Sequence, residues 1–255
     1  MSPCVVIVRI VCRVSVAGLA FCGPVCAARS PASVRQARQH RVVCALAHSA
    51  VPLRQAFFGG ETQGATRLDT IRILGIAGSL RKGSYNRSAL KAAQELLPDG
   101  AELELIDLHG IPMFNQDDEL SMPPVVLEFK RLILAADAIL FATPEYNYSI
   151  SGALKNAIDW ASRPYGKSAW SGKPAAIMGA SSGSLGTARA QYHLRQILVA
   201  QDMPVVNQPE VMIGNAAQRF DDKGQLGDEP TRKLIRALLA ALARLARHVA
   251  AGPAA

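Results

Sequence analysis

The sequence predicts an α/β fold in which helices cover both faces of a five-stranded parallel sheet. Between residues 71 and 250, short apolar runs alternate with longer stretches whose apolar residues recur at helical spacing. Three of the apolar runs end in loops that are rich in glycine, serine, proline or asparagine. Strands that alternate with helices form right-handed βαβ units, which place the strands parallel in one sheet between two layers of helices.

The first half of this region contains three predicted strands and two helices. Residues 71–77 are an apolar run that ends in a glycine and serine turn, as a buried strand does. Residues 86–97 follow as a helix, because their apolar residues share one face and a Pro-Asp-Gly turn ends the pattern. Residues 103–108 and 138–142 are the next strands. The helix between them, residues 124–136, has the apolar face Val125, Phe129, Leu132 and Ile133.

The second half adds two strands and three helices. Residues 151–162 are predicted as a helix, and residues 174–180 as a strand that runs into a Ser-Ser-Gly-Ser loop. Residues 187–201 form the next helix. The fifth strand is predicted at residues 204–206, with residues 211–213 as its continuation. The last helix, residues 231–249, has the apolar face Leu234, Ile235, Leu238, Leu239, Leu242 and Leu245.

Composition excludes several classes of protein and divides the chain in two. With 49% hydrophobic and 19% charged residues, the 255-residue chain is neither disordered nor a small disulfide scaffold. Only 5% of its residues are aromatic, which argues against a stacking platform for single-stranded nucleic acid. Residues 1–70 hold eight Arg and two acids, a net charge of +6, whereas residues 71–255 hold 20 basic and 18 acidic residues, a net charge of +2. We therefore expect no nucleic-acid partner.

The first 70 residues are expected to be a basic, disordered extension or a targeting segment. All five cysteines lie there, and the spacing of Cys22 and Cys26 fits neither a redox motif nor a zinc knuckle, so no metal site is expected. The uncharged run at residues 14–28 is too short to span a bilayer. The Val-Cys-Ala sequence at residues 25–27, near the end of this run, resembles a signal-peptidase site, and a start codon placed too far upstream is a further alternative. We expect a cytoplasmic protein without membrane association, unless this segment directs it elsewhere.

The loop after the first predicted strand is composed like a phosphate-binding loop. Glycine and serine amides can surround an anion, the helix that follows adds a positive dipole, and four side chains add donors, namely Ser79, Arg81, Ser84 and Asn86. Ser84 stands where the P-loop of triphosphate hydrolases needs lysine, and the dinucleotide-binding glycine pattern is absent. A monophosphate ligand remains. The alternative is a serine or asparagine helix cap without a ligand, for which Asn86 would serve.

Two further loops follow strands that are predicted to end at the same edge of the sheet. In the loop at 143–152, Pro144 and Tyr146 can form a wall for a flat ring, and the amides of Glu145, Tyr146 and Asn147 can donate to its heteroatoms. The loop at 181–186 permits close approach of the backbone to the polar edge of the same ring. The alternatives are loop packing for the tyrosines and a solvated carboxylate for Glu145.

Four sequence motifs resemble the NADPH-dependent FMN reductase family, within it the chromate and quinone reductases. They are GSLRKGSYNR at 78–87, TPEYNYS at 143–149, GALKNAIDW at 152–160 and ARAQYHLRQ at 188–196, and the resemblance extends over about residues 71–250. It implies a flavodoxin-like fold, noncovalently bound FMN, and a homodimer or homotetramer. It also implies three groups of FMN-binding residues: Ser79, Arg81, Ser84 and Asn86 at the phosphate, Pro144, Glu145, Tyr146 and Asn147 at the isoalloxazine ring, and Ser181, Ser182 and Gly183 in the third loop.

The function implied by this resemblance is hydride transfer from NADPH or NADH through FMN to a small-molecule acceptor, such as a quinone, free flavin or chromate. Since the cofactor carries this chemistry, no catalytic side chain is expected. His109 and His193 are expected to have structural or interface roles, and Arg189, Tyr192 and Gln196 to form a polar subunit contact. The alternative is an electron carrier like flavodoxin, or a flavin-binding regulator, without NAD(P)H turnover. The net charge of +2 argues against the acidic docking surface of a carrier.

Overall fold

Five parallel strands form one sheet in the order β2-β1-β3-β4-β5 in a computed structural model, which describes residues 70–252. The order reverses between β1 and β3, as in the flavodoxin-like folds, and this confirms the predicted fold class. Ligands of such sheets bind beyond the carboxyl ends of the strands at this reversal. The strand bounds are β1 (Ile71–Ala77), β2 (Ala101–Ile106), β3 (Ala138–Ala142), β4 (Ala175–Ala180) and β5 (Val211–Ile213).

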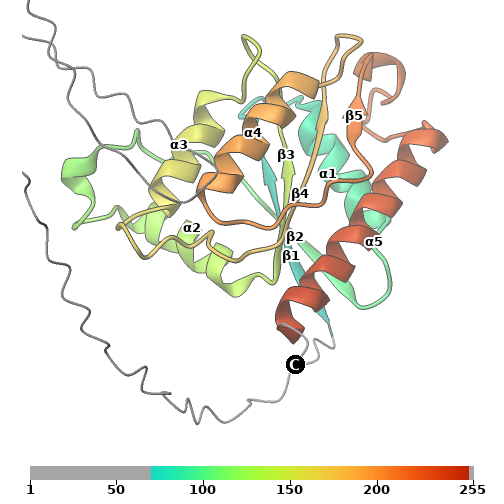
Figure 1. The fold of residues 1–255 in the computed structure, drawn as a ribbon. Helices are drawn as coiled ribbons and strands as arrows, with labels where there is room; N and C mark the ends of the chain where they lie inside the picture. The colour runs from blue at the N-terminus through green and yellow to red at the C-terminus, as the bar shows by residue number, and fades with distance from the viewer. Residues whose placement is uncertain (1–69, 253–255) are drawn as a thin grey trace, which may run out of the picture. The chain divides into compact units, whose positions relative to one another are not determined.

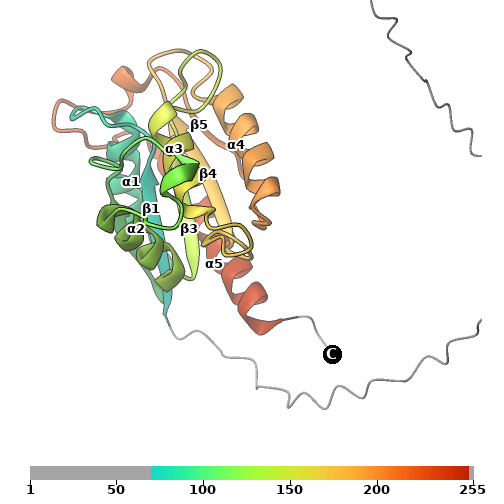
Figure 2. The same cartoon turned by 90° about the vertical axis from the view of Figure 1, so that its left-hand side faces the viewer.

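Helices cover both faces of the sheet (Figures 1 and 2). Two of them, α1 (Tyr85–Glu95) and α5 (Glu229–Ala251), pack on one face. The other three, α2 (Pro124–Ala135), α3 (Gly152–Ala161) and α4 (Ala188–Ala200), pack on the opposite face. Every residue of β3 and β4 is buried, because these central strands have neighbours on both sides and helices on both faces. No helix within residues 70–252 is long and apolar enough to cross a bilayer.

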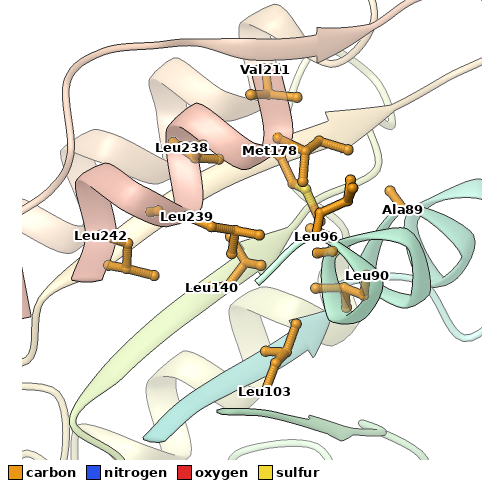
Figure 3. Packing of buried hydrophobic residues seen from close by; sticks show 14 of the residues in the cluster. Ala89, Leu90, Leu96, Leu103, Leu140, Met178, Val211, Leu238, Leu239 and Leu242 are labelled. Atoms are coloured by element: carbon orange, nitrogen blue, oxygen red, sulfur yellow. The ribbon is translucent and has the colours of Figure 1, made fainter. Parts of the chain in front are cut away.

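The core between the sheet and the α1–α5 face is made mainly of leucine and alanine (Figure 3). In this layer Leu238, Leu239 and Leu242 of α5 lie over the strands, close to Leu140 and Met178. Two residues that were predicted for apolar faces are instead exposed, since Val125 is 39% and Leu234 is 44% exposed. Each lies one position before a fully buried residue of the same helix, so the buried stripe is rotated slightly from the predicted one.

Of the predicted fifth strand, only the continuation at residues 211–213 forms a strand, so β5 is shorter than predicted. Residues 204–206 contribute only an isolated bridge between Val205 and Ala175, whereas Val211–Ile213 pairs with the end of β4. Ala175 pairs with Val205 and Met178 with Val211, so an advance of three residues along β4 corresponds to six residues along the neighbouring segment. The intervening residues leave the ladder, because Pro209 has no amide hydrogen to donate to it.

The other differences from the predicted bounds are small. β2 begins and ends two residues earlier than predicted, because Gly100 takes φ +70°, its carbonyl accepts from Ile71 N at 2.9 Å, and Ala101 already pairs with Ile71. α5 begins two residues earlier, where the carboxylate of Asp228 accepts from Thr231 N at 2.9 Å and caps the helix. These shifts leave the three predicted ligand loops at the carboxyl edge of the sheet.

Candidate active site

A cavity of about 290 Å³ lies beyond the carboxyl ends of β1, β3 and β4, between the loops that follow these strands. The loops after β3 and β4 rise from the same edge of the sheet in Figure 1. Nine of the eleven predicted site residues line the cavity, whereas Asn147 and Gly183 do not. Sequence reasoning missed two lining residues, Tyr85 and Ala180, each of which directly adjoins a predicted one. The full lining is Ser79, Arg81, Ser84, Tyr85, Asn86, Pro144, Glu145, Tyr146, Ala180, Ser181 and Ser182.

The loop between β1 and α1 brings two buried hydroxyls and one free cation to the cavity. Ser79 and Ser84 are each 4% exposed, and Ser84 caps α1 by accepting from Arg87 N at 3.4 Å. Arg81 is exposed and donates from its guanidinium to Gly83 O at 2.8 Å, and it has no ion-pair partner among residues 70–252. Hydroxyls, a helix N-terminus and an unpaired guanidinium together favour an anionic ligand.

Asn86 does not cap α1 but joins the first loop to the third. It lies in the first turn of the helix, where Ser84 is the cap, so a serine caps the helix as the alternative allowed, but Asn86 does not. Its Oδ1 accepts from Ala180 N at 2.8 Å and its Nδ2 donates to Ala180 O at 2.9 Å. The amide group therefore satisfies both backbone groups at the end of β4, and Asn86 is itself 3% exposed.

Two glycines allow the loops to approach each other closely. A Cβ on Gly78 would lie 2.9 Å from Pro144 Cδ, so the first and second loops are in contact there. The hydroxyl of Ser151 donates to Gly78 O and strengthens this contact. A Cβ on Gly179 would lie 1.8 Å from Thr187 Oγ1 and 2.5 Å from Thr143 O. Only glycine fits at either position without movement of the neighbouring loops.

The loop after β3 forms a tight two-residue turn beside the cavity. Tyr146 N donates to Ser149 O at 3.0 Å and Ser149 N donates to Tyr146 O at 2.9 Å. The two residues between them, Asn147 and Tyr148, have φ values of +50° and +66°. Pro144 is buried and Tyr146 is half-exposed, so these two residues form an apolar side of the cavity.

Glu145 is not a solvated carboxylate, and that predicted alternative is wrong. Its side chain is 6% exposed and forms an ion pair with the guanidinium of Arg189. It also accepts hydrogen bonds from the backbone N–H groups of Arg189, at 3.0 Å, and of Ala190, at 3.2 Å. Glu145 is the only acidic residue in the cavity lining, so its pairing with Arg189 leaves Arg81 as the uncompensated charge of the lining.

The loop after β4 is held in place by the segment that follows β5. Ser181 N donates to Ile213 O at 3.0 Å, and Ala216 N donates to Ser181 O at 3.0 Å. Asn215 N donates to Gly183 O, also at 3.0 Å. Gly183 therefore contacts this supporting segment, while Ser181 and Ser182 line the cavity.

The histidines at this edge of the sheet lie outside the cavity lining. His109 Nδ1 is 2.5 Å from Asp107 Oδ1, and His193 Nδ1 is 3.1 Å from Ser149 Oγ. Burial alone would raise the pKa of Asp107, but its hydrogen bonds to His109 and the charge of Arg87 lower it below the usual value. No cluster of three or more potential metal ligands occurs among residues 70–252.

The helix face that was predicted to form a polar contact is partly used within the chain. Arg189 is bound to Glu145, whereas Tyr192 and Gln196 are exposed. A hydrogen bond to Glu210 raises the pKa of the Tyr192 hydroxyl. The subunit role of Tyr192 and Gln196 stays a prediction.

Comparison with known proteins places this site in a family. The sequence profile of the NADPH-dependent FMN reductases matches residues 71–218. An NAD(P)H-dependent FMN reductase of Pseudomonas aeruginosa is 58% identical over 175 residues, which are 68% of this chain and 94% of that protein. An NAD(P)H:quinone oxidoreductase of Solanum tuberosum is 49% identical over 183 residues, 69% of this chain and 93% of that protein.

A solved structure agrees with the sequence relatives. The flavoenzyme NAD(P)H:(acceptor) oxidoreductase FerB of Paracoccus denitrificans superimposes with a TM-score of 0.65 at 37% identity, over 69% of this chain and 97% of that one. The profile match at residues 71–218 contains all three loops. The chain belongs to the NADPH-dependent FMN reductase family.

Proposed function

We propose that this protein is an NAD(P)H-dependent oxidoreductase that binds FMN in the cavity and reduces quinones and similar small molecules. The observation that carries the proposal is the convergence of the three loops on one cavity, with a hydroxyl-rich, cationic side and an apolar side. The relatives are reductases of FMN and of quinones by name, which supports the same reaction class.

The donor set fits the phosphate end of FMN. We assign Ser79, Arg81 and Ser84 to the phosphate, because buried hydroxyls and a helix N-terminus donate to oxyanions and Arg81 supplies the opposite charge. We include Asn86 in this group, because it keeps the first loop next to Ala180. The absence of a lysine after Gly83 is consistent with a single phosphate rather than a triphosphate.

The opposite side of the cavity fits the ring system. We assign Pro144 and Tyr146 as its wall, and the third loop to its polar edge, with Ser181 and Ser182 in the lining and Gly183 next to them on the side of the supporting segment. The amide of Tyr146 is already bound to Ser149 O, so the donors that this loop offers are the amides of Glu145 and Asn147. A flat ligand against an apolar wall with a few backbone donors is a common arrangement in cofactor sites.

FMN, when bound, supplies the hydride chemistry of the reaction. The residues of the chain then have to bind the phosphate, orient the ring and leave one side open for NAD(P)H and for the acceptor. Within the described residues, the only carboxylate of the lining, that of Glu145, is bound to Arg189 and to α4, and no histidine lines the cavity. We therefore propose that no side chain transfers the hydride or relays a proton in the chemical step.

The wider proposal concerns the whole chain. Residues 71–250 form the reductase domain, and residues 1–70 are an extension or a targeting segment. We propose a homodimer or homotetramer that acts in the cytoplasm, where NAD(P)H is available, without a nucleic-acid or membrane partner.

The test is the visible absorption spectrum of the purified protein, followed by anaerobic addition of NADPH or NADH and then of a benzoquinone. Absorption near about 370 and 450 nm that bleaches with the nucleotide and returns with the quinone is the expected result. Bleaching by dithionite but not by either nucleotide would instead support the electron-carrier alternative. A colourless protein that takes up no added FMN would disprove the proposal.

A further inference from the structure

The turn that follows the wall residues Pro144 and Tyr146 has an unfavourable backbone conformation. Tyr148 has φ +66°, in the left-handed region that a bulky residue with a Cβ avoids, and Asn147 precedes it at φ +50°. A turn of two such residues is usually built from asparagine and glycine. Such a conformation persists only where surrounding contacts hold it in place.

The contacts that hold this loop come from the start of α4. Thr187, the residue before the helix, makes no side-chain capping bond. The carboxylate of Glu145 takes its place, accepting from Arg189 N at 3.0 Å and Ala190 N at 3.2 Å. The bond between loop and helix is thus a capping interaction made by a residue 44 positions away along the chain.

Arg189 completes the connection from the other side. Its guanidinium pairs with Glu145, and its Cζ lies 3.8 Å from the centroid of the Tyr148 ring. A cation at this distance over an aromatic face is attracted to it. One turn further along α4, His193 contacts Ser149 at 3.1 Å. The first turns of α4 therefore contact the loop at Glu145, Tyr148 and Ser149.

We propose that Glu145 and Arg189 are positioning residues, which fix the loop at 143–149 on α4 and thereby set the wall formed by Pro144 and Tyr146. Glu145 lies directly between these two wall residues, so the bonds that hold its carboxylate on α4 restrict the backbone on both sides of it. Its carboxylate oxygens are already engaged by α4 and Arg189, so the side chain acts on the ligand through the wall. This inference rests on the proposed function, because it takes FMN as the ligand of the wall.

The chain contains a matched control for this arrangement. Asp228 also caps a helix, α5, through Thr231 N at 2.9 Å, and it pairs with Arg219 at 2.7 Å. It does not line the cavity. Substitution of Asp228 removes the same kind of cap and ion pair at a different place, so it separates a general loss of helix capping from a specific effect on the wall.

The experiment compares Glu145→Gln, Glu145→Ala and Arg189→Ala with Asp228→Asn and Asp228→Ala. Each protein is freed of flavin and titrated with FMN by fluorescence, and amide hydrogen exchange of the loop is measured without flavin. We expect Glu145→Ala to raise the Kd for FMN about tenfold, a magnitude typical of residues that support a binding group. Glu145→Gln should be intermediate, because its amide oxygen still accepts from α4. The amides of Tyr146 and Ser149 should exchange faster in the Glu145 and Arg189 variants only.

The outcomes separate the inference from the proposed function. An unchanged Kd and unchanged exchange in Glu145→Ala, with FMN bound normally by the wild-type chain, would overturn the inference alone. Equal effects of Glu145→Ala and Asp228→Ala on the Kd would also overturn it, because the effect would then be general. Failure of the wild-type chain to bind FMN would overturn the proposed function, and the inference with it. If Glu145→Ala does not fold, the graded effects of Glu145→Gln and Arg189→Ala decide the matter.

Discussion

Asn86 binds both backbone groups of Ala180, accepting from its N–H at 2.8 Å and donating to its carbonyl at 2.9 Å. The two residues are 94 positions apart, and this single side chain sets the spacing between the loop that carries Arg81 and the loop that carries Ser181. Both partners are buried, so this link between the two loops is shielded from bulk water in the folded protein.

Asn86→Ala should therefore destabilise the protein and weaken FMN binding together. Loss of the side chain leaves a buried N–H and a buried carbonyl without partners, which costs about 2 kcal/mol or more in the free energy of unfolding. Urea unfolding of the flavin-free protein measures the first effect and FMN titration the second. A change of less than about 0.5 kcal/mol, the range of ordinary surface substitutions, would contradict the structural role.

Arg81→Ala should weaken FMN binding without loss of stability. The guanidinium is exposed and bonds only to the nearby Gly83 carbonyl within the described residues, so the fold does not depend on it. Removal of one charge-assisted contact to a phosphate should raise the Kd about tenfold. The flavin-to-protein ratio after dialysis measures this, with Lys82→Ala as the control, since Lys82 is a neighbouring exposed cation that does not line the cavity. Equal flavin loss from both variants would show that the effect is one of general charge.

Gly179→Ala should be strongly destabilising. The added Cβ would lie 1.8 Å from Thr187 Oγ1 and 2.5 Å from the backbone oxygen of Thr143, so the end of β4 or the start of α4 has to move. Overpacking of this kind costs about 1–3 kcal/mol or more. Gly227→Ala is the control, because a Cβ there meets nothing within 4 Å. Equal melting temperatures of the two variants would show that the loops relax easily.

The contribution of Asp228 to stability should depend on pH. The hydrogen bond from Thr231 is the main cause that lowers the pKa of Asp228, while burial opposes it and Arg219 adds to the lowering. Folding lowers the pKa of this carboxyl, so its ionised form stabilises the folded protein at pH values above the pKa of the unfolded chain, about 3.9. The stabilisation is lost as the pH falls through the pKa of the folded protein. Asp228→Asn should thus be less stable than wild type by about 1 kcal/mol at neutral pH. Urea unfolding at several pH values should show the two curves converging in acid, and a constant difference would contradict the assignment.

The parts of the fold that follow from local pattern were predictable from the sequence. β1 and β3 have the predicted bounds and β4 differs by one residue, because each is an uninterrupted apolar run that a turn ends. The first part of the predicted fifth strand, residues 204–206, was wrong, because the segment that contains Pro204 and Pro209 follows β4 for one bridge and leaves it before β5 begins at Val211. Hydrophobicity does not reveal where such a segment rejoins the sheet.

The candidate site was predictable to the same extent. Residue type and position at the strand ends identified most of the lining, since parallel strands bring their following loops to one edge. The partners of Glu145 and Asn86 were not predictable, because they lie 44 and 94 positions away and nothing in the local sequence specifies them. Tyr85 and Ala180 could have been found as the direct neighbours of predicted residues.

The attachment of the loop at 143–149 to α4 also affects how the acceptor preference of this enzyme can change. If the wall is set by α4, substitutions at Arg189, Ala190 or His193 alter the width of the cavity although none of these residues lines it. The residues at the phosphate side are unchanged by such substitutions, so the contacts to the phosphate are kept and flavin affinity falls only by the share that the wall contributes. An evolving or engineered variant can thus gain new acceptors through its helix, at a cost in flavin affinity that the phosphate contacts limit.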